Sequence, residues 1–301
     1  MGRPILPTDP ADPSGQDRRE RGAINEMTMR IRQCGKAYKD SLDQIEFLAV
    51  NAKQYEFKTS PTAVQTLLSE VGKIVDSIMG KGGRWLFSRF MKPAYQQGTA
   101  KANANIGNQS ELYKEARPLE KLLTSKPYLK RLSLLRGREF NDMQGIIGDV
   151  KTTLARTLTQ GLADGVGPLE IGRRIAESTD IVEHRANRIA RTETGEALRE
   201  GRLAETEAAQ SLGIKVGVMH LSALSPTSRK DHVDRHGWVG TVQQEREWYA
   251  AEPGRPINCK CSPSEMLLND DGTPMFEDVV ERTRKAREHW QELHPPKKSK
   301  S

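Results

Sequence analysis

Apolar residues recur every three or four positions through most of this chain, a spacing that restricts it to long amphipathic helices. The first such helix is predicted between residues 23 and 51. Ser60 and Pro61 then supply the N-cap and first residue of a second helix, which the glycine-rich stretch 80–83 ends. The same reasoning predicts helices at 93–105, 119–135, 138–161, from Pro168 onward, and at 182–210. The apolar positions of the first helix are Ile24, Met27, Ile31, Cys34, Tyr38, Leu42, Ile45 and Leu48.

β-Branched residues cluster for the first time at 214–220, where their alternation predicts a strand, and a second short strand is expected at 238–242. Everything before Ile214 is predicted to be helical or connecting turn. The fold class is therefore α+β and mostly α-helical. We expect a disordered arm at 1–21, a helical region at 22–136, a small α+β module at 137–265, and a charged helix with a Lys-rich tail at 266–301.

Composition agrees with an extended helical part joined to a small packed module. Of the 301 residues, 36% are hydrophobic and 5% aromatic, and the mean hydropathy is −0.68, so one core across the whole length is not expected. Three cysteines do not suggest a disulfide framework. The N-terminus lacks an apolar signal core and no apolar run reaches the length of a membrane span, which predicts a protein made in the cytoplasm with reduced thiols and no membrane partner.

The charge balance is basic, with a net charge of +7 and an isoelectric point near 9.3. Such a balance favours nucleic acid or acidic protein surfaces as partners. A solvated surface of mixed charge is the other interpretation, since 40 acidic residues accompany 47 basic ones. Basic residues within 121–138 and 297–300 predict, at most, weak sequence-independent contact with double-stranded DNA.

Two cysteines and two histidines stand in metal-ligand spacing near the C-terminal end. Cys259 and Cys261 flank one residue, while His232 and His236 would share one face if helical. Two nitrogen and two sulfur ligands match structural zinc, which would staple the loop-rich stretch 221–261. The other interpretation is that His236 is a turn residue and the cysteines are small, buried and free.

Catalytic interpretations are available but weaker. Arg191, Thr192 and Glu193 lie on a predicted helix, where a glutamate beside an arginine could serve an ADP-ribosyltransferase-like effector. His232 and His236 with Asp231 or Asp234 could instead form a metal-dependent nuclease. No Gly-rich phosphate loop or G-x-S-x-G turn occurs, no partner nucleophile for Glu193 is apparent, and a structural role is favoured, with no catalytic residue assigned.

Four motifs follow one another in the second half of the chain. They are the glycine turn at 160–167, the R-A-x-x-I-A-R-T-E helix from Arg185 through Arg191, Thr192 and Glu193, the R-x-x-H-x-x-x-x-G element of Arg229, His232 and Gly237, and the I-N-C-K-C loop with Asn258. In this order they resemble the Mu F-like head-morphogenesis family of tailed bacteriophages. The chain departs from the family at Ser225 and Thr227, where many members have Asp and Arg, and at Arg235-His236, which replace an apolar residue.

This resemblance implies a minor head protein of the virion, made with the capsid genes. Its expected partners are the portal protein and other head proteins, and it would act in procapsid assembly, with a further part in genome packaging or ejection. We expect the helical region 22–136 to dock on the portal through apolar anchors such as Ile31, Leu42 or Leu67.

Overall fold

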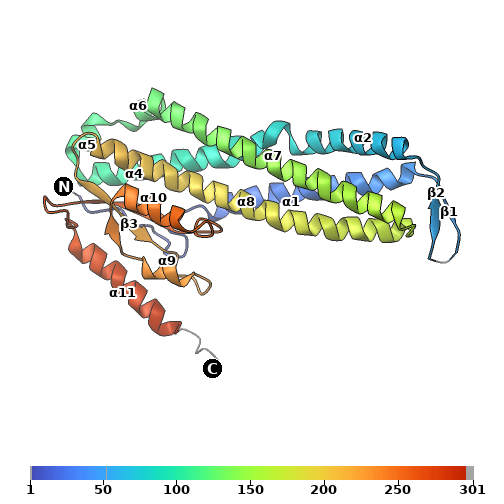
Figure 1. Cartoon of the computed structure of the whole chain (residues 1–301). Helices are drawn as coiled ribbons and strands as arrows, with labels where there is room; N and C mark the ends of the chain where they lie inside the picture. The colour runs from blue at the N-terminus through green and yellow to red at the C-terminus, as the bar shows by residue number, and fades with distance from the viewer. Residues whose placement is uncertain (1, 52, 296–301) are drawn as a thin grey trace. The chain divides into compact units, whose positions relative to one another are not determined.

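The computed structural model describes residues 2–51 and 53–295 and shows a mostly α-helical protein with two small sheets (Figure 1). It divides into two compact units, each assembled from separate stretches of the chain. The helical unit contains Arg21–Phe90 and Leu134–Arg191, and the sheet unit contains Met1–Glu20, Met91–Ser133 and Thr192–Ser301. Among the described residues, no helix combines the length and apolar character needed to cross a bilayer.

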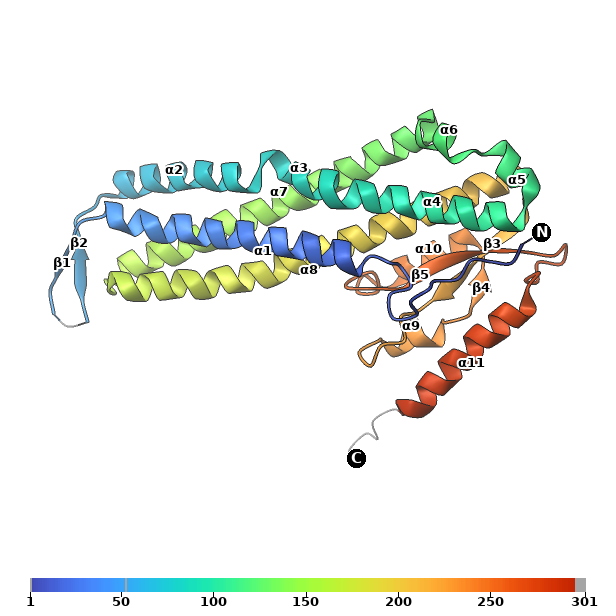
Figure 2. The ribbon, with the colours of Figure 1, turned by 180° about the vertical axis from the view of Figure 1, so that it is seen from behind.

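Long helices form the helical unit, and in both views they run alongside one another (Figures 1 and 2). They contribute buried side chains such as Met27, Val75 and Leu154 to a shared core. Ser60 accepts a hydrogen bond from the amide of Ala63, which confirms the predicted N-cap. The elements are α1 (Asp17–Asp40) from Arg21 on, η1 (Ser41–Gln44), β1 (Phe47–Ala49), β2 (Tyr55–Phe57), α2 (Pro61–Met79), η2 (Lys81–Gly83), α3 (Arg84–Leu86), the π-helical turn η3 (Phe87–Met91), and the adjoining parts of α7 (Lys126–Ala163) and α8 (Pro168–Gln210).

The prediction of helix through residue 51 is wrong, because α1 ends at Asp40 and a β-hairpin follows. Strands β1 and β2 pair antiparallel with Phe47 opposite Phe57. Between the strands, the Asn51 side chain accepts a hydrogen bond from the amide of Lys53. Helical spacing continues to Leu48, so the hydrophobic pattern alone did not reveal where the helix stops.

A three-stranded antiparallel sheet with the order β4-β3-β5 organises the sheet unit. Strand β3 (Val216–Leu221) confirms the predicted first strand, β4 (Val239–Gly240) lies within the second, and β5 (Ser262–Leu267) was not predicted. The helices of this unit are α4 (Lys92–Gln109), α5 (Glu111–Ala116), α6 (Leu119–Leu123), α9 (Lys230–Asp234), α10 (Val242–Ala251) and α11 (Glu277–Leu293), with the adjoining ends of α7 and α8.

Strand β5 escaped prediction because a carboxylate occupies its buried centre. The Glu265 side chain has no exposed surface and forms two hydrogen bonds with Arg202 of α8, of 2.9 and 2.6 Å. Asn105 of α4 donates a third, of 2.8 Å. These partners offset the cost of burying the charge, and they join α4, α8 and the sheet.

Residues 2–16 are held by specific hydrogen bonds and do not form the disordered arm that was expected at 1–21. The amide of Ile5 donates to the Asn105 side chain at 2.6 Å, and the amide of Gly2 donates to the Asn108 carbonyl at 2.8 Å. The Asp12 carboxylate accepts from the amides of residues 15, 16 and 17, which starts α1 at Asp17. Proline restricts this segment to extended conformations, and specific hydrogen bonds hold it against the sheet unit.

The boundary expected near residue 136 falls inside α7, and the two helices predicted from Pro168 and at 182–210 are one continuous helix, α8. Helix α11 occupies the predicted C-terminal helical stretch. The Lys-rich end at 297–300 lies outside the described residues.

Candidate functional site

Three metal-ligand side chains converge in the sheet unit. One ring nitrogen from each of His220 and His232 and the Sγ of Cys261 lie within 4.8 Å of one another, and all three residues are buried. Cys259 adjoins them, with its Sγ 3.4 Å from His232 Nδ1, while Cys261 Sγ lies 3.2 Å from the same nitrogen. The four residues, called the His–Cys cluster below, come from three places in the sequence.

Sheet pairing creates this convergence. His220 and Leu221 end β3, and they pair with Pro263 and Ser262 at the start of β5. The residues just before β5, Cys259 and Cys261, are thereby brought beside the end of β3. His232 lies on α9. Arg229, the residue just before this helix, donates hydrogen bonds to the carbonyls of Gly254 and Arg255, both at 2.6 Å, and so holds the start of α9 in place.

A buried carboxylate orients His220. Glu245 of α10 accepts a hydrogen bond from His220 Nδ1 at 2.6 Å, and it also bonds Arg235 at 3.0 Å. Burial alone would raise the pKa of Glu245, but the charges and hydrogen bonds of His220 and Arg235 keep it below its ordinary value. Because an ionised carboxylate only accepts, His220 Nδ1 carries the proton of this hydrogen bond.

Both histidines of the cluster have one ring nitrogen that forms no hydrogen bond with the described residues. Within the described part of the chain, His220 Nε2 and His232 Nε2 are buried and have no hydrogen-bond partner. Trp248 covers both rings, with centroids 5.0 Å from His220 and 4.9 Å from His232. Buried polar atoms in native proteins are nearly always satisfied, so these two atoms require an explanation.

The two thiols differ in acidity. A hydrogen bond from Cys261 holds the pKa of Cys259 well below its ordinary value despite burial, and His232 and Arg199 add favourable positive charge. The pKa of Cys261 is correspondingly raised, by its hydrogen bond to Cys259 and by burial. All three cysteines of the chain are free thiols, and Cys34 lies in the helical unit.

His236, expected as a ligand from its spacing to His232, lies apart from the cluster. Helix α9 ends at Asp234, so the two histidines do not share a helical face. His236 Nδ1 accepts a hydrogen bond from the amide of Ser222 at 2.9 Å, and its ring lines a separate pocket of about 200 Å³ beside Pro10 and Thr283. Burial, together with nearby His220 and Arg287, lowers the pKa of His236 to about 4.

His220 was missed because a histidine in an apolar strand gives no ligand signal by itself. Its role depends on the pairing of β3 with β5, and β5 was not predicted. The signal available in the sequence was a single polar side chain in the otherwise apolar run Val216–Leu221, all of which is buried.

The remaining motif residues hold loops and helices in place. Thr192 accepts a hydrogen bond from the amide of Asn258 at 3.1 Å, and Asn258 has a φ of 53°, a left-handed conformation that asparagine tolerates. Gly237 has a φ of 79°, and an added Cβ would lie 3.1 Å from the backbone nitrogen of Arg284. In the helical unit, Arg185 pairs with Asp149 at 2.7 Å. These contacts hold loops and helices together.

The acidic residues of the nuclease alternative are engaged in ion pairs. Asp231 pairs with Arg255 at 3.3 Å, and Asp234 pairs with Lys230 at 2.5 Å. Since His232 and His236 face different surroundings, the described geometry does not assemble the constellation that this alternative requires. For the transferase alternative, the structure adds only that Arg191 and Glu193 lie on α8.

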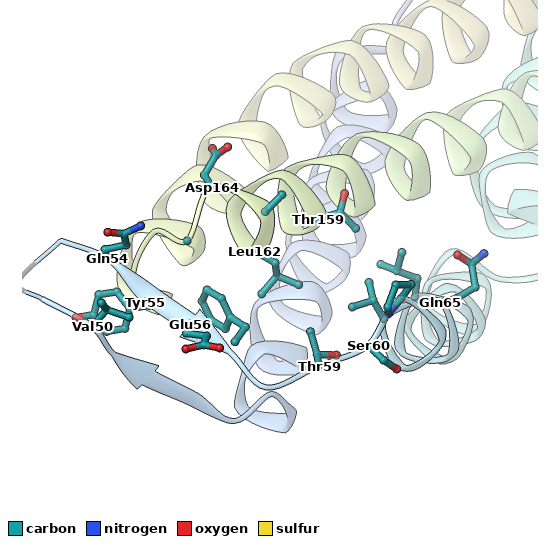
Figure 3. Close-up of a pocket in the computed structure, with 16 residues that line it drawn as sticks. Val50, Gln54, Tyr55, Glu56, Thr59, Ser60, Gln65, Thr159, Leu162 and Asp164 are labelled. Carbon is teal, nitrogen blue, oxygen red and sulfur yellow. The ribbon is translucent and has the colours of Figure 1, made fainter.

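A second candidate surface lies at the end of the helical unit, where the β1–β2 hairpin adjoins the turn between α7 and α8. A pocket of about 810 Å³ opens there, with walls from the hairpin, the start of α2 and the end of α7. Figure 3 shows Tyr55 and Glu56 of β2 on one wall and Thr159 and Leu162 of α7 on another. Beside it Phe47, Leu48 and Val50 are exposed.

Comparison with known proteins identifies one family. Residues 152–264 match the family model described as phage Mu protein F like protein, and this range contains the whole His–Cys cluster. The resemblance inferred from the sequence motifs is thereby confirmed. Comparisons with curated proteins and with solved structures return no significant match.

Proposed function

We propose that this chain is a minor head protein incorporated at the portal vertex during procapsid assembly, because residues 152–264 match the model of the phage Mu protein F-like family. The family match is the observation that carries this proposal. The expected partners are the portal protein and other head proteins, and the expected location is the virion, after assembly in the host cytoplasm. The packed, ion-paired surroundings of the motif residues agree with a structural role.

The docking anchors expected from the sequence need correction. Ile31, Leu42 and Leu67 are only 0%, 7% and 8% exposed, because they pack inside the helical unit. They are therefore not available to a partner in the folded chain. The apolar periodicity that suggested them is accounted for by the core of the unit itself.

The β1–β2 hairpin is a better docking element. Phe47, Leu48 and Val50 are 46%, 53% and 61% exposed, and adjacent exposed apolar groups are typical of protein interaction sites. On the outer edge of β2 the Tyr55 amide donates to the Gly165 carbonyl at 2.8 Å, so the edge that a partner strand would extend is that of β1. We assign this surface, with the pocket beside it, to contact with the portal protein.

DNA contact is a further part of the proposal. Lys121, Lys126 and Lys130 are exposed on α6 and on the first turns of α7. Exposed lysines bind phosphate without reading sequence and release counterions as they do so. Such weak contact suits a protein that lies beside a packaged genome and accompanies it at ejection.

The test uses the full chain co-expressed with the other head proteins of its phage. Leu48→Ser with Val50→Ser should lower the copy number in procapsids at least several-fold, because two exposed anchors are lost without disturbing a core. Leu169→Ser with Ile181→Ser is the matched control, since these side chains on α8 are 92% and 70% exposed. Equal incorporation of both variants at the unaltered level refutes docking through the hairpin. If the unaltered chain never enters heads, the minor-head assignment itself fails.

A further inference from the structure

We propose that the His–Cys cluster is a structural zinc site, in which His220, His232, Cys259 and Cys261 supply four protein ligands to one Zn²⁺. This ligand set replaces the one expected from sequence spacing, with His220 in the place of His236. The inference rests on the geometry of the sheet unit and is independent of the proposed function.

The donor chemistry suits zinc. Two thiols and two imidazoles form the mixed sulfur and nitrogen set that four-coordinate Zn²⁺ takes in structural sites. Zinc–nitrogen bonds of about 2.0–2.1 Å and zinc–sulfur bonds of about 2.3 Å require nitrogen and sulfur ligands roughly 3.6 Å apart. His232 Nδ1 already lies 3.2 Å from Cys261 Sγ and 3.4 Å from Cys259 Sγ.

His220 completes the set through Nε2. Its Nδ1 donates to the buried Glu245 carboxylate at 2.6 Å, which leaves the Nε2 lone pair to bind a metal. A carboxylate that orients a histidine in this way is the usual outer-shell partner of a zinc ligand. His220 Nε2 is buried and, in the described residues, lacks a hydrogen-bond partner. A bound metal would satisfy this atom.

The site is structural because protein ligands fill all four positions, leaving none for a reacting water. Zinc here would link the end of β3, helix α9 and the loop before β5. Between Leu221 and Ser262 the chain otherwise forms only short elements, α9, β4 and α10. A bound structural metal ion commonly stabilises such a segment when its own core is small.

The first experiment uses the unaltered full chain, purified without chelators. Elemental analysis should find about one zinc per chain. Replacement of the zinc by Co²⁺ should give the visible absorption of a four-coordinate ion and the near-ultraviolet band of thiolate-to-metal charge transfer. Less than a tenth of the expected zinc, with no such cobalt spectrum, would overturn the proposal.

Variants then separate the two ligand sets. In competition with a chelator, His220→Asn should lose the metal, whereas His236→Asn should bind it as the unaltered chain does. Glu245→Gln should weaken binding roughly 10- to 100-fold, as expected for an outer-shell partner. Cys34→Ala serves as the thiol control and should leave metal content unchanged. Loss of metal from His236→Asn with retention by His220→Asn would refute the assigned ligands. If His220→Asn does not fold, the cobalt spectrum of the unaltered chain and the Glu245→Gln affinity still decide the question.

Discussion

A single methyl group at Gly201 should separate two helices of the sheet unit. A Cβ there would lie 2.3 Å from the carbonyl oxygen of Tyr95 and 3.1 Å from the amide nitrogen of Thr99. Both are backbone atoms of α4, so no side chain can move aside. Overpacking costs about 1–3 kcal/mol, with this site at the upper end, and removing a helical glycine returns about 0.5–1 kcal/mol. Gly201→Ala should therefore lower the free energy of unfolding by about 2 kcal/mol.

Gly145→Ala is the matched control, because this glycine is also inside a helix and an added Cβ would meet nothing within 4 Å. It should stabilise the protein by about 0.5–1 kcal/mol. Thermal unfolding followed by circular dichroism should show Gly201→Ala melting roughly 3 °C below the unaltered chain. If Gly201→Ala is as stable as Gly145→Ala, the close packing of α4 on α8 is refuted.

Three further outcomes follow from buried and exposed charges. The folded pKa of His236, about 4, lies below its unfolded value because burial favours the neutral ring. The free energy of unfolding should therefore fall by about 3 kcal/mol as the pH drops from about 6.5 toward 4. His236→Gln should reduce this pH dependence, as measured by denaturant titration. Arg202→Met should cost about 3–5 kcal/mol of unfolding free energy, because it leaves the buried Glu265 carboxylate unpaired. Lys126→Gln with Lys130→Gln should weaken DNA binding and reduce the salt dependence of its affinity by about one phosphate contact per lysine.

Each of these has its own control. Glu177→Gln breaks an exposed pair with Arg173 and should change the stability by less than about 0.5 kcal/mol, so an equal effect of Arg202→Met would contradict the buried-pair argument. A pH slope identical in the unaltered and His236→Gln chains would assign the acid sensitivity to other groups. DNA affinity that is the same at low and physiological salt would show that these lysines serve solubility or protein contacts.

Helix positions were predictable because local rules determine them. Ser60, Pro61 and the glycines near residue 80 mark the limits of α2, and Pro168 marks the start of α8. The end of α1 was missed because Leu42, Ile45 and Leu48 keep the helical spacing after the backbone has left the helix. Leu42 and Ile45 remain buried past Asp40, whereas Leu48 is exposed on the hairpin, so the spacing did not distinguish helix from hairpin.

Sequence spacing pointed to three of the four proposed metal ligands. Cys259, Cys261 and His232 lie close enough in the chain for their spacing to be noticed. His220 joins them through the register of β3 and β5, and β5 was obscured by the buried Glu265, whose partner Arg202 lies on a distant helix. Such long-range pairing is set by tertiary structure, so local patterns do not reveal it.

The central claim, incorporation at the portal vertex, is tested most directly by quantitative mass spectrometry of procapsids assembled with and without the portal protein. We predict that this chain is present in few copies per particle when the portal protein is included and absent when it is omitted. Equal copy numbers in both preparations, or absence from both, would contradict the account.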